Sequence, residues 1–575
     1  MKWQENLSRP IYGVKAQYNV WIPMRDGVRL SADIYLPDKE GKYPVLLMRT
    51  YYGKCNSDLS SDEMKEFVHY FVERGYVLVI QDCRGRYDSE GEFYIEIYDF
   101  DDGYDTVEWC GTQEWSSGNV GMLGCSYPGC VCWSAAISGN EHLKCIAPRD
   151  ATSDSYFNGG FMHGGVVEGW LLWCVHTAGR TARSKLEKAI DWRRAYQQLP
   201  LINLDEHLGF NFPWWKDSFK HPCYDEYWER FSYENKHDRV ATPSLNIGGW
   251  YSSSDIDGTI RNFLGVTEKG KRLPQGTHHK LLIGPWSHCK IVTSYGEMNF
   301  EEEANIDLRE VMLRWFDYWL KGKDTGIMDE PPVKYFLMGA NKWCTAQQWP
   351  PEGVSFTRYY IHSGGRANSL LGDGLLGTEP PVDETFDQYT YDPQNPVPFP
   401  LGDFENVILD QRVVERRDDV LVYTTLPLEE DINVIGPIRA QIFASSSAVD
   451  TDFVAKLVDV YPNDMAIYLT IGIVRARYRT SYEQPTLIQP GVIYEYNIDM
   501  SNTANQFKKE HRIRLEISSS AFPLFLKNQN TGKDIGTDTE SIVARQRICH
   551  NRDYLSYLEL PILKQPAYST EKKRR

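Results

Sequence analysis

The sequence has no long apolar run. Nowhere in its 575 residues does a stretch approach the roughly 18 apolar residues that a membrane-spanning helix needs. The first 18 residues lack the apolar core and small-residue cleavage site of a signal peptide. We therefore expect a soluble, cytoplasmic protein with no membrane partner.

Basic residues and cysteines are also scarce. The 62 lysines and arginines are outnumbered by 79 aspartates and glutamates, which gives a net charge of −17 and argues against a nucleic-acid partner. The 12 cysteines show no framework spacing, and the group Cys125, Cys130 and Cys132 lacks the second pair that a zinc site requires. We expect buried, reduced thiols, with neither a metal nor another cofactor.

The pattern along the chain predicts two kinds of architecture. Short apolar segments bounded by Gly or Pro alternate with amphipathic ones, which indicates an α/β sheet. The strands are expected at 43–49, 76–80, 120–124, 244–248 and 280–284, and the helices at 61–74, 102–110, 127–138, 259–264 and 308–320. We assign 1–151 and 241–325 to this core, 152–240 to a helical cap insertion, and 332–567, where short segments alternate, to a β-sandwich or jelly roll.

The sharpest motif is Gly124-Cys-Ser-Tyr-Pro-Gly129, which follows a predicted strand and precedes a predicted helix. This is the context of a nucleophile elbow, in which a tight turn exposes the hydroxyl of Ser126. The next backbone N–H, that of Tyr127, would then point at a developing oxyanion. A plain glycine-bounded turn would explain the same residues.

A serine becomes nucleophilic only when a base removes its proton. His288 follows the last predicted strand, where the histidine of a doubly wound hydrolase stands. The order nucleophile, acid, histidine then requires a carboxylate between the two, and Asp255 and Asp257 follow the strand at 244–248. Alternatively, His288 is a structural histidine whose ring nitrogens are hydrogen-bonded within a turn.

Several ordered motifs carry a family resemblance. They are Met24–Tyr35, Arg49–Lys54, Gln81–Arg86, Asp102–Trp109, Gly124–Gly129, Gly249–Tyr251, Gly284–His288, Asp450–Tyr461 and Arg514–Phe522. In these stretches the chain resembles the cocaine esterase / X-prolyl dipeptidyl-peptidase family of α/β-hydrolase serine hydrolases. The resemblance implies an α/β-hydrolase core, an inserted helical cap and a C-terminal jelly-roll domain.

The resemblance also assigns roles. Ser126 falls on the nucleophile, His288 on the general base, and Tyr52 on a tyrosine whose hydroxyl joins the Tyr127 N–H in the oxyanion hole. Family members place an aspartate where this chain has Ser252. We expect Asp255 to be the acid, with Asp257 as the first alternative and a distant carboxylate, or no acid at all, as the second.

These residues predict a serine hydrolase that cleaves an ester or amide of a small acyl substrate through a covalent acyl-enzyme. An aminoacyl-directed hydrolase, either an X-prolyl dipeptidyl-peptidase or an α-amino-acid ester hydrolase, is the second hypothesis, with Asp255 or Asp257 holding the substrate ammonium. A non-catalytic binding protein with a decayed triad is the third.

The predicted cap contains four tryptophans that we expect either to line the acyl pocket or to form the core of the cap. They are Trp170, Trp173, Trp214 and Trp215. The sequence leaves a homo-oligomer open.

Overall fold

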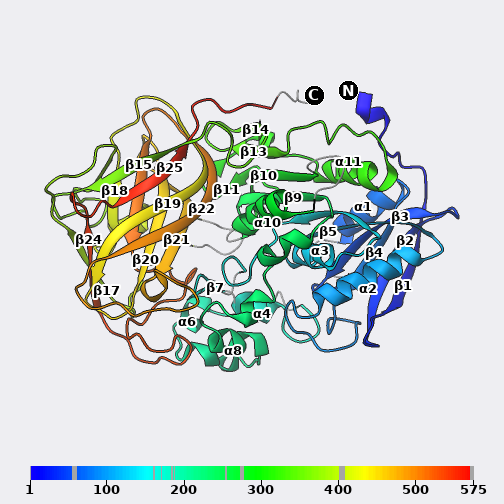
Figure 1. Ribbon diagram of the computed structural model, residues 1–575, viewed down its shortest axis with the longest axis horizontal. Coiled ribbons are helices and arrows are strands. Elements are labelled where there is room, and N and C mark those ends of the chain that lie inside the picture. Colours follow the sequence, from blue (N-terminus) through cyan, green and yellow to red (C-terminus); the bar gives the residue numbers. More distant parts are fainter. Residues whose placement is uncertain are drawn as a thin grey trace.

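A computed structural model describes most of the chain (Figure 1). The described residues are 2–54, 61–159, 162–169, 171–182, 186, 188–252, 255–271, 278–400 and 408–569. Two β-bodies lie side by side in Figure 1, and a mainly helical segment lies below the space between them.

The first body is built on a ten-stranded sheet with the order β1-β2-β4-β3-β5-β6-β9-β10-β13-β14. Seven adjacent strands are parallel, and they are β3 (Tyr43–Thr50), β4 (Val77–Asp82), β5 (Ser116–Cys125), β6 (Leu143–Arg149), β9 (Ser244–Tyr251), β10 (His279–Ser287) and β13 (Val333–Leu337). Antiparallel strands complete both edges: β1 (Val14–Pro23), β2 (Arg29–Pro37) and β14 (Lys342–Ala346). This architecture confirms the predicted α/β class.

Helices cover both faces of the parallel strands. One face packs against α1 (Ser61–Val72) and α11 (Leu308–Lys321), the other against α2 (Asp99–Thr112), α3 (Tyr127–Ser138) and α10 (Asp255–Lys269). Strand β4 is buried on both faces, which explains its apolar run Val77–Ile80. Leu78 joins the cluster under α1 and α11, while Val79 joins the cluster under α2 and α3. Parallel strands buried on both faces lose the alternation of a half-exposed strand.

The segment between β6 and β9 has short helices around an aromatic core. Its elements are the hairpin β7 (Met162–His163) and β8 (Val166–Val167), then α4 (Leu171–His176), α6 (Trp192–Ala195), α7 (Leu204–His207), α8 (Pro213–Lys220) and α9 (Glu226–Glu229). Tyr156, Trp214, Trp215 and Phe219 are buried in one cluster there with Tyr51 and Tyr127 of the first body. The insertion therefore covers the edge of the sheet where β3 and β5 end.

The second body is an eleven-stranded, largely antiparallel sheet. Its strands are β15 (Ser355–His362), β16 (Leu375–Gly377), β17 (Asp387–Tyr391), β18 (Leu421–Thr424), β19 (Ile432–Ser446), β20 (Asp452–Val460), β21 (Ala466–Arg475), β22 (Tyr494–Phe507), β23 (Arg512–Ser518), β24 (Ala544–Cys549) and β25 (Tyr557–Ile562). The predicted change to successive strands is confirmed, although β19 and β22, with 15 and 14 residues, are not short. A jelly-roll topology stays a prediction.

The predicted boundary at residue 332 does not coincide with the division between the sheets. Strand β13 pairs in parallel with β10, and β14 pairs with β13, so 333–346 extend the first sheet. The reason is a long-range pairing that the local strand pattern does not record.

In the part of the chain that the structure describes, no helix combines the length and apolar composition needed to cross a membrane.

Candidate active site

Ser126 stands on a sharp turn between β5 and α3. Its backbone angles, φ 64° and ψ −132°, lie outside the regions that a non-glycine residue usually adopts. Gly124 makes the turn possible, because a Cβ there would come within 2.4 Å of the Pro128 backbone. The Ser126 N–H donates to the Arg149 carbonyl at 2.9 Å, which ties the turn to β6. This strand, strained serine and helix have the geometry of a nucleophile elbow.

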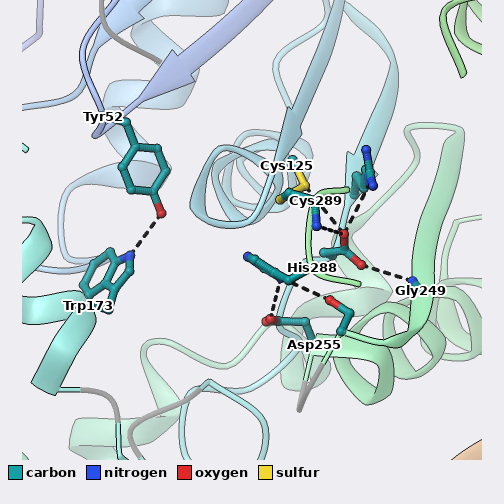
Figure 2. The surroundings of a disulfide bond; sticks show 10 residues. Tyr52, Cys125, Trp173, Gly249, Asp255, His288 and Cys289 are labelled. Carbon is teal, nitrogen blue, oxygen red and sulfur yellow. Dashed lines mark hydrogen bonds and ion pairs between the residues drawn. A yellow bond between two sulfur atoms is a disulfide. The ribbon is translucent and has the colours of Figure 1, made fainter. Parts of the chain in front are cut away.

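His288 follows β10 at the same edge of the sheet, and its Nδ1 faces two oxygens (Figure 2). Nδ1 lies 3.1 Å from Asp255 Oδ2 and 3.1 Å from Ser252 Oγ. The Asp255 side chain is only 6% exposed, whereas that of His288 is 39% exposed. An Nδ1–H donated to the carboxylate leaves Nε2 as the basic nitrogen on the accessible side of the ring.

Electrostatics favours a basic His288. Burial disfavours the imidazolium, but the Asp255 carboxylate outweighs burial, so the pKa of His288 is raised above its ordinary value. Burial raises the pKa of Asp255, and the positive charge of His288 opposes that rise. The pair therefore has the arrangement of a general base and its orienting acid.

Asp257 faces elsewhere. Its carboxylate accepts from Ser501 Oγ at 2.8 Å and from Asn502 Nδ2 at 3.1 Å, and both donors belong to β22. The structure thus brings Asp255, and not Asp257, to His288. Two residues separate Asp255 from Ser252 in the sequence, but the first turn of α10 returns its side chain toward His288.

A disulfide joins Cys125 to Cys289, the residues that adjoin Ser126 and His288 (Figure 2). Their Cα atoms are 5.9 Å apart, although 164 positions separate them in the sequence. The expectation that every cysteine is a reduced thiol is therefore wrong for these two. Spacing along the chain could not reveal the bond, because the ends of β5 and β10 meet only in the folded sheet.

Asp150, which the sequence analysis did not single out, supports the same region. This buried residue follows β6, and its carboxylate accepts from the Cys289 N–H at 2.8 Å and from the Gly249 N–H at 3.2 Å. It also lies 3.4 Å from Arg149 Nε. Its position just after a parallel strand, at the edge where Ser126 and His288 stand, is the signal that could have indicated it.

Tyr52 and Tyr127 both lie at this edge. The Tyr52 hydroxyl, just past β3, accepts from Trp173 Nε1 at 3.0 Å and is therefore oriented (Figure 2). Tyr127 begins α3, and the first N–H groups of a helix have no intrahelical acceptor. The Tyr127 ring is stacked on Trp173, with centroids 6.0 Å apart.

A cavity opens beside Ser126. Tyr127, Trp173 and Asp255 line it, together with Glu96 and Ser155. A second cavity, lined in part by Trp214, shares Glu96 and Ser155 with the first. Trp215 is fully buried and donates to the Leu201 carbonyl, so it is cap core. Trp170 lies outside the described residues.

One group among the described residues has the composition of a metal site: Cys125, Asp150 and Cys289. Its two sulfur atoms are bonded to each other, so neither is a thiolate ligand.

Comparison with known proteins gives consistent matches. Residues 26–290 match the X-Pro dipeptidyl-peptidase (S15 family), and residues 325–559 match the X-Pro dipeptidyl-peptidase C-terminal non-catalytic domain. The chain is 39% identical to cocaine esterase of Rhodococcus sp. (strain MB1 Bresler), over 95% of this chain and 98% of that protein.

Two solved structures are similar over nearly the whole length. An aminopeptidase from a marine-sediment Thaumarchaeota archaeon has a TM-score of 0.83 at 26% identity, covering 97% of each chain. An α-amino acid ester hydrolase also has a TM-score of 0.83 at 26% identity, covering 96% of this chain and 97% of the other.

Proposed function

The chain belongs to the cocaine esterase / X-Pro dipeptidyl-peptidase family and is a serine hydrolase acting on ester or amide bonds, and we propose that Ser126 is its nucleophile. The observation that supports this proposal is that the strained turn at Ser126 and a histidine with a buried carboxylate on its Nδ1 stand at the same edge of the sheet, where the Cys125–Cys289 bond joins their sequence neighbours. In this proposal Ser126 Oγ attacks the carbonyl carbon while His288 Nε2 accepts its proton.

The remaining groups have distinct roles. Tyr52 O–H and the Tyr127 N–H donate to the oxyanion of the tetrahedral intermediate. His288 then protonates the leaving group, and the acyl-enzyme forms. Water, deprotonated by His288, releases the acid and restores Ser126. Asp255 fixes the histidine tautomer and stabilises the imidazolium throughout.

A fluorophosphonate probe tests the nucleophile. We expect one adduct on Ser126, found by mass spectrometry of the digested protein, and none in Ser126→Ala. Turnover of that variant on a simple ester should fall roughly 10⁴-fold or more with the circular dichroism spectrum unchanged. Retention of a tenth of the wild-type turnover would exclude Ser126.

The aminoacyl-directed hypothesis needs a carboxylate for a substrate ammonium. Neither Asp255 nor Asp257 suits this role. The Asp255 carboxylate pairs with His288, and the Asp257 carboxylate accepts hydrogen bonds from Ser501 and Asn502. The two similar structures, an aminopeptidase and an α-amino acid ester hydrolase, favour such substrates.

The third hypothesis, a non-catalytic binding protein, disagrees with membership in a family of esterases and peptidases. A cytoplasmic location and a homo-oligomer stay predictions. The Cys125–Cys289 bond weighs against the first of these, because disulfides are rare in reducing compartments.

A further inference from the structure

Glu96 is a buried carboxyl group beside the proposed nucleophile. It lies in the segment between β4 and α2, and only 4% of its surface is exposed. Its backbone has φ 58°, a strained value for a non-glycine residue. Strain of this kind concentrates at functional sites, which makes Glu96 a candidate for one.

The described residues give Glu96 no cationic partner. Ser155 Oγ donates to its Oε2 at 2.6 Å, and no ion pair to Glu96 occurs in the described part of the chain. Lys236 is the nearby lysine that affects its pKa, but Lys236 Nζ donates to the carbonyls of Glu229, Arg230 and Ser232 instead. A buried carboxylate without a counter-charge is costly, so it needs an explanation.

The position of Glu96 supplies one. It lines the cavity of Ser126 and also the second cavity, whose aromatic walls are Trp214, Tyr227, Trp228 and Phe231. Aromatic faces together with a carboxylate are the chemistry that binds an ammonium group. Asp99 and Asp154, which raise the pKa of Glu96 by their own charges, make the region more favourable to a cation.

We propose that Glu96 binds a protonated amino group on the acyl part of the substrate. The substrates would then be esters or amides of amine-bearing acids. This inference rests on the proposed function, because it takes the Ser126 cavity to be where the acyl group is bound.

The protonation state of the free protein is consistent with this role. Burial, with Asp99 and Asp154, raises the pKa of Glu96 to about 8. At neutral pH the empty site therefore holds a mostly neutral carboxyl group, which avoids an unpaired buried charge. Binding of an ammonium would release that proton to solvent and leave an ion pair.

The test compares two esters that differ only in the amine: L-phenylalanine methyl ester and methyl 3-phenylpropionate. In Glu96→Gln we expect kcat/KM for the amine ester to fall roughly 100-fold, as for loss of a buried charge pair, and that for the neutral ester to stay within threefold. The matched control is Glu234→Gln, because Glu234 also accepts from a serine, Ser153 Oγ at 2.6 Å, but lines neither cavity. We expect Glu234→Gln to leave kcat/KM unchanged for both esters.

Binding without turnover gives a second measurement. Wild-type protein should be inhibited more strongly by 2-phenylethylammonium than by 2-phenylethanol, and Glu96→Gln should lose that preference. If Glu96→Gln lowered kcat/KM equally for both esters, or still bound the ammonium inhibitor more strongly than the alcohol, the proposed role of Glu96 would be overturned. Failure of the proposed function is distinguishable, because fluorophosphonate would then not label Ser126 in wild-type protein or in Glu96→Gln.

Discussion

His288 shows how one substitution along the chain can be offset by a nearby residue. The family resemblance implies an aspartate at the position of Ser252, whose neutral hydroxyl cannot stabilise an imidazolium. The first turn of α10 instead brings Asp255 to 3.1 Å from Nδ1, and Ser252 Oγ lies at the same distance. The charge on His288 is thus balanced by a residue three positions further on.

We expect Asp255→Asn to lower turnover roughly 10³- to 10⁴-fold, because the wrong tautomer of His288 is then favoured. The pH profile gives a second readout. His288 acts as a base only when neutral, so kcat/KM falls as pH drops through its pKa, which Asp255 raises. Removing the carboxylate should therefore move this acid limb to lower pH.

Ser252→Ala is the matched control for that variant. It removes the Ser252 hydroxyl from His288 Nδ1 but leaves the Asp255 carboxylate. We therefore expect turnover to fall only a few-fold and the acid limb of the pH profile to stay where it is in the wild type. A large loss in Ser252→Ala with a mild one in Asp255→Asn would contradict the assignment of the acid.

Tyr52 is the second residue with a distinct kinetic signature. Its hydroxyl should donate more strongly to the oxyanion than to the resting carbonyl, so Tyr52→Phe should cost roughly 10² to 10³ in kcat with KM little changed. Steady-state kinetics on one ester measures both. Trp173→Phe, which removes the indole N–H that orients Tyr52, should cost less. A rise in KM alone would mean that Tyr52 only lines the pocket.

At the scale of elements, the disulfide links the ends of β5 and β10. It adjoins Ser126 on one strand and His288 on the other. A bond closing a loop of 164 residues typically contributes about 2–5 kcal/mol to stability. It also limits the distance that the two reactive side chains can drift apart.

We therefore expect a thiol reductant to lower Tm by about 5 °C and kcat by about tenfold, since a misplacement of about 1 Å is costly. Cys125→Ala/Cys289→Ala should behave like the reduced protein and no longer respond to the reductant. Thermal melts and ester assays with and without dithiothreitol measure both effects. Identical wild-type values in the two conditions would contradict the expectation.

Much of the element pattern was predictable because it depends on local chemistry. Val77–Ile80 of β4 form a continuous apolar run, and the helix after Ser126 begins at Tyr127 as expected. Strand β6, with Lys144 and Pro148, carries a weaker pattern and was missed. Pairing between distant segments was also missed, as for β10 with β13 and Cys125 with Cys289, because local patterns do not encode it.

The same distinction applies to the site. Ser126, His288 and Asp255 stand at strand ends or helix starts, so their order along the chain allowed the triad to be predicted, and its chemical roles still await the experiments above. Glu96 could not be found in this way, whereas Asp150 stands just after β6, which is a signal that could have indicated it. Their importance lies in what surrounds them: Glu96 is a buried carboxyl group without a cation, and the Asp150 carboxylate accepts from one backbone N–H in β9 and from another just after β10.

At the scale of the whole molecule, the two β-bodies share one hydrophobic core. Trp250 and Phe336 of the first body are buried in the same cluster as Ile498 and Phe507 of β22. Asp257 adds a polar link across this boundary through Ser501 and Asn502. The second body therefore contributes to holding α10, on which Asp255 stands.

A shared core predicts that the molecule unfolds as one unit. We expect a single calorimetric transition for the wild-type chain, and Asp257→Ala should shift that entire transition to lower temperature. The substitution leaves two donors without their acceptor, which should cost about 1–3 kcal/mol. Asp499→Asn is the control, because it removes the charge of an exposed ion pair with Arg261 across the same boundary but keeps an oxygen that can accept from the Ser501 N–H, and such ion pairs contribute little. Two separate transitions, with Asp257→Ala moving only one, would show that the bodies unfold independently and that Asp257 does not couple them.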